Sequence, residues 1–183
     1  MSFSFPKSKK SAYGYEPTEV DAFIAKAREQ YARSEADLLA SLDLRRTEFK
    51  LVKGGYSISA VDSAIDKLED TFADREISRL RMRGGFEALH ERKMEIKLAL
   101  VGRLERKRGK RFKNTGLILR GYNRRQVERF LTRVEKHIES GDALSLDYVR
   151  RIIFKASRGG YAENQVDAFI DRVIQILHIE RNS

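Results

Sequence analysis

The chain has 183 residues, of which 41% are hydrophobic and 35% charged, and it contains no cysteine. This length allows one sizeable domain or two small ones, and the lack of cysteine excludes disulfides and thiolate metal sites and fits a reducing compartment. No apolar run approaches the roughly 20 residues of a membrane span, and the basic start MSFSFPKSKK lacks the apolar stretch of a secretory signal. We therefore expect a cytoplasmic protein.

The net charge of +10 is concentrated in the middle of the chain. Residues 1–75 carry 12 basic and 13 acidic residues, residues 76–120 carry 14 and 5, and residues 121–183 carry 11 and 9. A concentrated basic segment attracts phosphate groups, whether on nucleic acid or on anionic lipid.

Apolar periodicity predicts a mostly α-helical fold, and no proline follows Pro17 to interrupt it. In chain order, we expect helices over about 17–40, 58–83, 86–108, 124–140 and 163–180, and short helical turns at about 43–48 and 145–152. Gly84-Gly85 breaks the pattern between the second and third helices. The segments 50–53 and 117–119 are expected to be extended, but we expect no real sheet.

Four segments share one motif, in which a Gly-Tyr pair is followed five residues after the tyrosine by valine and an acidic residue. The segments are Gly14-Tyr15 with Val20-Asp21, Gly55-Tyr56 with Val61-Asp62, Gly121-Tyr122 with Val127-Glu128, and Gly160-Tyr161 with Val166-Asp167. A phenylalanine precedes the glycine by nine residues in the first and third segments and by six in the others. This alternation predicts two motif pairs, at 1–75 and 111–183, joined by a basic helical linker at 76–110.

Each position of the motif has a physical interpretation. The glycine permits either a positive φ or a close backbone approach, and the tyrosine is expected to pack beside the start of a helix. The valine and the apolar pair after it share one helical face, and the acidic residue in the first turn suits the helix dipole. Pro17 fits a first helical position, and Asn123 with Gln126 fits a capping box.

A basic cluster is the best candidate for contact with phosphate. Its seven members within eleven positions are Arg103, Arg106, Lys107, Arg108, Lys110, Arg111 and Lys113. The cluster is interpreted either as a solvated helix end and loop or as a site for lipid or nucleic-acid phosphate.

No pattern of catalytic residues is found in the sequence. His90, His137 and His178 are isolated from one another, and neither a GxxxxGK[ST] loop nor a G-x-S-x-G elbow occurs. We therefore expect no enzyme activity, no metal, no cofactor and no small-molecule substrate.

Residues 144–173, LSLDYVRRIIFKASRGGYAENQVDAFIDRV, resemble the N-terminal domain of DivIVA, the bacterial cell-division and polar-growth scaffold. The tandem arrangement resembles the small DivIVA-repeat proteins of actinobacteria. The resemblance implies membrane contact through an apolar and a basic residue before Gly-Tyr. The residues that match this pair are Val52-Lys53 and Leu119-Arg120, whereas the fourth segment has Ser157-Arg158 and the first has Ala12-Tyr13.

This resemblance implies a non-catalytic scaffold or adaptor that acts by self-association or by binding a protein partner, at the inner membrane face. The alternative is a nucleic-acid-associated protein that uses residues 103–113. We expect no counterpart of the family's long coiled coil in these residues, because the helices after the first two motifs show no sustained heptad pattern. The two motifs of a pair are instead expected to pack together within one chain.

Overall fold

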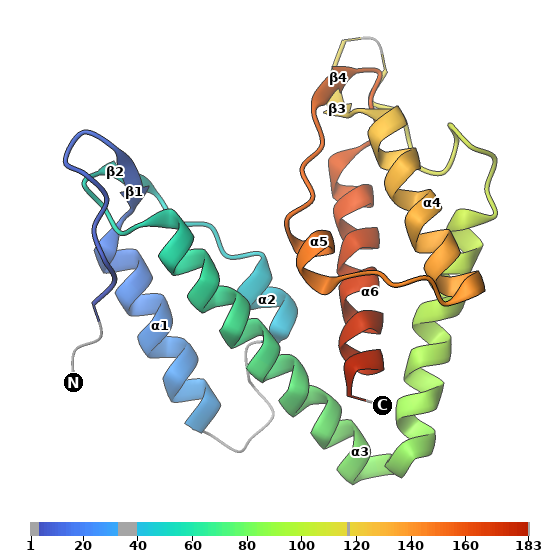
Figure 1. The fold of residues 1–183 in the computed structure, drawn as a ribbon, viewed down its shortest axis with the longest axis horizontal. Helices are drawn as coiled ribbons and strands as arrows, with labels where there is room; N and C mark the ends of the chain where they lie inside the picture. The colour runs from blue at the N-terminus through green and yellow to red at the C-terminus, as the bar shows by residue number, and fades with distance from the viewer. Residues whose placement is uncertain (1–3, 33–39, 117, 183) are drawn as a thin grey trace. The chain divides into compact units, whose positions relative to one another are not determined.

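In a computed structural model, which describes residues 4–32, 40–116 and 118–182, the chain is mostly helical, as predicted (Figure 1). It divides into two compact units, Met1–Ser78 and Arg79–Ser183. Of the segment expected as a linker, 76–110, residues 76–78 lie in the first unit and residues 79–110 in the second.

The described residues of unit 1, 4–32 and 40–78, form two helices and the first part of a third. Its elements are β1 (Tyr13–Tyr15), α1 (Pro17–Ala32), α2 (Ser41–Arg45), β2 (Leu51–Lys53) and the start of α3 (Ile58–Leu104). Helix α1 begins at Pro17, as predicted, and the predicted continuation over 33–39 lies outside the described residues.

Unit 2, residues 79–183, contains the rest of α3 and three further helices. Its other elements are β3 (Arg120–Tyr122), α4 (Arg124–Ser140), α5 (Leu146–Arg150), β4 (Ala156–Arg158) and α6 (Glu163–Arg181). The break expected at Gly84-Gly85 is present, because Gly85 has a non-helical backbone with φ of 68° and ψ of −160°. Helix α3 ends at Leu104, so the expected helix to 108 was too long.

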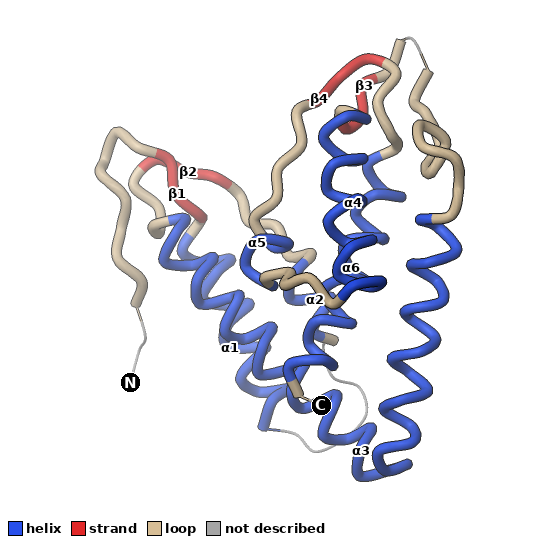
Figure 2. Tube along the Cα trace, turned by 45° about the vertical axis from the view of Figure 1, so that its right-hand side comes forward, coloured by secondary structure: helices blue, strands red, loops and turns tan. Residues whose placement is uncertain are grey.

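The expectation of no real sheet was wrong, because each unit holds one two-stranded antiparallel sheet (Figure 2). Strand β1 pairs with β2, and β3 pairs with β4. Isolated bridges extend this pairing to Tyr15 with Tyr56 and to Tyr122 with Tyr161. Each sheet therefore joins two Gly-Tyr segments that lie far apart in the sequence.

The Gly-Tyr glycines are needed for a close approach of two backbones and not for a positive φ. A Cβ atom added to Gly121 would lie 2.3 Å from the Tyr161 carbonyl oxygen, and one added to Gly160 would lie 2.4 Å from the Gly121 carbonyl oxygen. In unit 1 a Cβ atom added to Gly14 would lie 2.3 Å from the Tyr56 carbonyl oxygen, and one added to Gly55 would lie 2.4 Å from the Tyr15 carbonyl oxygen. None of the four has a positive φ, so the second of the two interpretations of the motif glycine is correct.

In the core of each unit, the phenylalanine of each Gly-Tyr segment packs against the tyrosine of the other segment. In unit 1 the Phe5 ring packs against Tyr56, with centroids 5.4 Å apart, and the Phe49 ring packs against Tyr15 at 5.3 Å. The corresponding pairs in unit 2 are Phe112 with Tyr161 and Phe154 with Tyr122, both at 5.3 Å. The four motif valines, Val20, Val61, Val127 and Val166, are completely buried.

We predict that Gly121→Ala destabilises the protein by about 3 kcal/mol, because the new methyl group meets the backbone of Tyr161 as well as the Thr115 side chain, and the backbone oxygen at 2.3 Å cannot rotate away. The matched control is Gly102→Ala on α3, where nothing lies within 4 Å of the added Cβ. This control should stabilise the protein by about 0.5–1 kcal/mol, as alanine does in a helix. Urea unfolding measures both, and equal effects of the two substitutions would contradict the close-approach account.

Candidate functional site

The tyrosine of each segment is directed to the acidic residue of the opposite segment. The Tyr56 hydroxyl donates a hydrogen bond to Asp21 Oδ2 at 3.1 Å, and the Tyr161 hydroxyl donates one to Glu128 Oε1 at 2.5 Å. The acidic residue of the motif therefore has a second role besides its interaction with the helix dipole. Its carboxylate accepts a hydrogen bond from the tyrosine hydroxyl of the opposite segment.

The raised pKa values of the other two tyrosines indicate the same contact with the acidic residue of the opposite segment. Burial, together with the charge and hydrogen bonding of Asp167, raises the pKa of Tyr122 to about 12. Burial and the Asp62 carboxylate raise the pKa of Tyr15 in the same way. Burial also raises the pKa of Tyr161, and the Glu128 carboxylate adds to the effect. A raised tyrosine pKa favours the neutral hydroxyl, which is the form that donates to a carboxylate.

Backbone groups at the helix starts are also satisfied across the pair. The residue after each tyrosine donates its N–H to the carbonyl of the residue that follows the opposite segment's phenylalanine. In unit 2 these bonds run from Asn123 to Lys155 and from Ala162 to Lys113, both at 2.8 Å. In unit 1 they run from Glu16 to Lys50 and from Ser57 to Pro6, also at 2.8 Å.

The side chain four residues after the tyrosine also takes part in this contact. It accepts the backbone N–H of the residue that follows the opposite segment's phenylalanine, where that residue has an N–H. Gln126 Oε1 accepts from the Lys155 N–H at 2.7 Å, and Gln165 Oε1 accepts from the Lys113 N–H at 3.0 Å. The capping box expected for Asn123 and Gln126 is therefore half correct. The Asn123 side chain caps the Gln126 N–H at 3.2 Å, but the Gln126 side chain turns to the opposite segment.

Unit 1 shows why one segment lacks a polar residue at this position. Glu19 Oε2 accepts from the Lys50 N–H at 2.8 Å, as the glutamines do in unit 2. The second segment has Ala60 there, and the opposite residue is Pro6, which has no N–H to satisfy. The alanine therefore leaves no buried donor unpaired.

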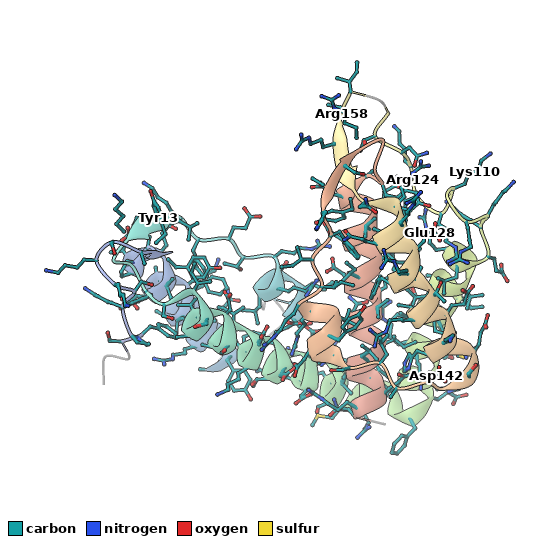
Figure 3. The ribbon with its side chains drawn as sticks, turned by 45° about the horizontal axis from the view of Figure 1, so that its top comes forward. Tyr13, Lys110, Arg124, Glu128, Asp142 and Arg158 are labelled. Atoms are coloured by element: carbon teal, nitrogen blue, oxygen red, sulfur yellow. The ribbon has the colours of Figure 1, made fainter. Side chains whose placement is uncertain are left out.

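The β3–β4 end of unit 2 brings exposed apolar and basic side chains together. Ile118 is 90% exposed and Leu119 is 65% exposed. Arg120 lies directly opposite Arg158 in the register of the two strands, and both are exposed. Figure 3 shows Arg158 at this end of the unit. The predicted contact residues Leu119, Arg120 and Arg158 therefore share one surface, the unit 2 tip, which we define as Ile118–Arg120, Lys155 and Arg158.

The corresponding end of unit 1 differs from the prediction at one residue. Val52 is half-buried, and its neighbour Leu51 is 50% exposed instead. Tyr13, which is 59% exposed, lies opposite the exposed Lys53 in the strand register. Pairing thus combines an aromatic residue of the first segment with a basic residue of the second, although neither segment carries both.

The side chains of three of the seven basic-cluster residues make polar contacts within unit 2. The Arg111 guanidinium is buried and forms ion pairs with Glu128 at 3.5 Å and Glu135 at 3.1 Å. Arg103 Nη1 donates to the Arg111 carbonyl at 2.9 Å and stacks over the Phe112 ring. Arg108 donates to Thr132 Oγ1 at 3.0 Å and also pairs with Glu128 at 3.8 Å.

The other four cluster residues, Arg106, Lys107, Lys110 and Lys113, are exposed. The cluster is therefore part structural and part surface, and neither of its two predicted interpretations describes all of it. Phe112, its only aromatic residue, is buried and offers no platform for stacking a base.

Two of the histidines join helices of unit 2. His137 Nε2 lies 2.9 Å from Glu180 Oε2, and its Nδ1 lies 2.7 Å from the Asp142 carbonyl oxygen. The buried His178 accepts from Arg150 at 3.3 Å. Among the residues that the structure describes, no group of three or more histidine and acidic side chains is placed to hold a metal ion.

Comparison with known proteins does not identify a family: no protein-family model, curated protein or solved structure matches the chain. Within the described ranges, no helix is both long enough and apolar enough to cross a membrane.

We predict that Tyr161→Ala lowers the free energy of unfolding by about 3–4 kcal/mol, because its ring is completely buried between the two segments. Phe86→Ala is the matched control, since that ring is 75% exposed, and its effect should stay within about 0.5 kcal/mol. Chemical denaturation followed by circular dichroism measures both. An unchanged stability of the Tyr161→Ala protein would show that the tyrosine does not hold the pair together.

Proposed function

We propose that this protein is a non-catalytic adaptor or scaffold of the DivIVA kind, built from two pairs of the Gly-Tyr motif. It binds an anionic membrane surface through the unit 2 tip and the corresponding end of unit 1. Each motif pair then serves as a single-chain counterpart of a dimeric membrane-binding unit. A protein partner or a second copy of the chain would bind elsewhere on the units.

The composition of the unit 2 tip is the observation that carries the proposal. Ile118 and Leu119 expose apolar surface directly before Arg120, Arg158 lies opposite Arg120, and the exposed Lys155 directly precedes β4. Like charges directly opposite in a sheet, as Arg120 and Arg158 are, destabilise it unless an anion lies nearby. Phospholipid headgroups supply such an anion, and the acyl boundary beneath them accepts the two apolar side chains.

The motif exchange supports the proposal because hydrogen bonds of Thr115 connect Leu119 to the opposite Gly-Tyr segment. The Thr115 hydroxyl donates to the Leu119 carbonyl at 3.0 Å, and the Thr115 N–H donates to the Gly160 carbonyl at 2.9 Å. The loop that carries Leu119 is thereby tied to the Gly-Tyr segment on the opposite strand.

We predict that the wild-type protein co-sediments with vesicles of phosphatidylcholine mixed with phosphatidylglycerol, and not with phosphatidylcholine alone. Arg120→Gln/Lys155→Gln/Arg158→Gln should weaken this binding by about 3 kcal/mol, since each cation near an anionic surface contributes about 1 kcal/mol. Leu119→Ser should weaken it as well, by removing apolar surface from the acyl boundary.

The matched control is Arg125→Gln/Arg129→Gln/Lys136→Gln, which removes the same number of charges from exposed positions of α4. This control should keep most of the vesicle binding. The proposal fails if the wild-type protein ignores anionic vesicles at low salt, or if the two triple variants lose binding equally.

A further inference from the structure

All of the net charge of the chain arises from one continuous stretch. Residues 106–136 contain 12 basic and 2 acidic residues, a net charge of +10, which equals that of the whole chain. The remaining residues are therefore balanced. The stretch comprises the loop after α3, the strand β3 and most of α4.

Helix α4 places four cations along one exposed face. Arg125, Arg129, Arg133 and Lys136 follow one another at intervals of four, four and three residues, which keeps them on one side of a helix. All four are exposed, and we call them the α4 basic face. The face spans roughly 16 Å at 1.5 Å per residue. Its guanidinium groups match the geometry of phosphate oxygens.

The two acidic residues of the stretch do not neutralise this face. Glu128 and Glu135 lie on the adjoining side of α4, where both pair with the buried Arg111. Glu128 also accepts the Tyr161 hydroxyl and the Gly109 N–H. In the described part of the chain, no ion pair joins Arg125, Arg129 or Lys136 to a carboxylate.

The loop after α3 extends the basic surface beside α4. Arg108 donates to Thr132, which is three residues from Arg129 and four from Lys136 on the helix. Figure 3 shows Lys110 on this loop and Arg124 on α4 at the same end of unit 2, with Glu128 below them. The exposed Arg106, Lys107 and Lys110 therefore continue the α4 basic face.

The placement of the apolar side chains of α4 favours nucleic acid over lipid as the partner of the α4 basic face. A helix that lies on a membrane turns its apolar side to the lipid, but Val127, Phe130 and Val134 of α4 are buried in the core. None of the exposed large apolar side chains found among the described residues lies on α4. Arg133 lies 4.0 Å from the centroid of the half-buried Tyr148 ring, and none of the exposed aromatic rings found among the described residues lies on α4. The face therefore offers contacts to phosphates and no exposed platform for stacking single-stranded bases, which favours a duplex.

We propose that the α4 basic face, with Arg106, Lys107 and Lys110 of the adjoining loop, binds the phosphate backbone of duplex nucleic acid without reading its sequence. The site is separate from the unit 2 tip, so it stands or fails independently of the vesicle binding proposed above. Its affinity arises from release of counterions from the duplex and falls steeply with salt.

The test is fluorescence anisotropy with a labelled DNA duplex of about 20 base pairs, which is longer than the face. A plot of log affinity against log salt concentration should have a slope of about −3 or steeper for the wild-type protein. Arg125→Gln/Arg129→Gln/Lys136→Gln should reduce the slope by about 3 and weaken binding about tenfold or more at ~100 mM salt. A second duplex of unrelated sequence should bind equally well.

The control is Arg120→Gln/Lys155→Gln/Arg158→Gln, which removes three charges from the unit 2 tip and should leave most of the DNA affinity. Unchanged melting temperatures of both variants establish that they fold. Equal losses in the two variants, preference for a single strand of the same length, or loss of vesicle binding alone in the α4 variant would each overturn the proposal.

Discussion

In each unit, two backbone segments approach so closely that neither of the facing glycines has room for a Cβ atom. The other contacts of the unit follow from this approach. Because Gly121 and Gly160 lie against each other's main chain, Tyr122 and Tyr161 form a bridge, and each segment's phenylalanine packs on the other segment's tyrosine. Each helix start then donates a backbone N–H to a carbonyl of the opposite segment, and the Glu or Gln side chains of three helix starts accept an N–H from it, so neither segment can form its native contacts alone.

Sequence spacing predicted the helices and their buried faces because these depend on residues three and four apart. It also offered close approach as one of two roles for the motif glycine. The two motifs of a pair were expected to pack together, but the exchange of side chains between them was not predicted, since the partners Tyr161 and Glu128 are 33 residues apart and no local rule connects them. One signal was present and was overlooked: Ala60 replaces the Glu or Gln of the other segments, and Pro6 occupies the position whose N–H that side chain would accept. The strands were not predicted because three residues are too few to show the alternation of apolar and polar side chains that marks a strand.

The basic residues show a second limit of the sequence pattern. A charge count treats Arg111 and Lys110 alike, but one is buried against Glu128 and Glu135 and the other is exposed. This difference in burial depends on α4, because that helix carries both carboxylates that pair with Arg111. The spacing of Arg125 and Arg129 in a predicted helix was sufficient to indicate a basic face. The cluster at 103–113 drew attention because it is denser in sequence.

The exchange between segments is tested most directly by a double-mutant cycle on Tyr56 and Asp21, which come from different segments and are joined by a hydrogen bond of 3.1 Å. Urea unfolding of Tyr56→Phe, Asp21→Ala and the double variant gives their coupling energy, with Tyr56→Phe and Asp62→Ala as the control cycle within one segment. The exchange predicts a coupling of about 1 kcal/mol for Asp21 and almost none for Asp62. Absence of coupling to Asp21, or a larger coupling to Asp62, would contradict it.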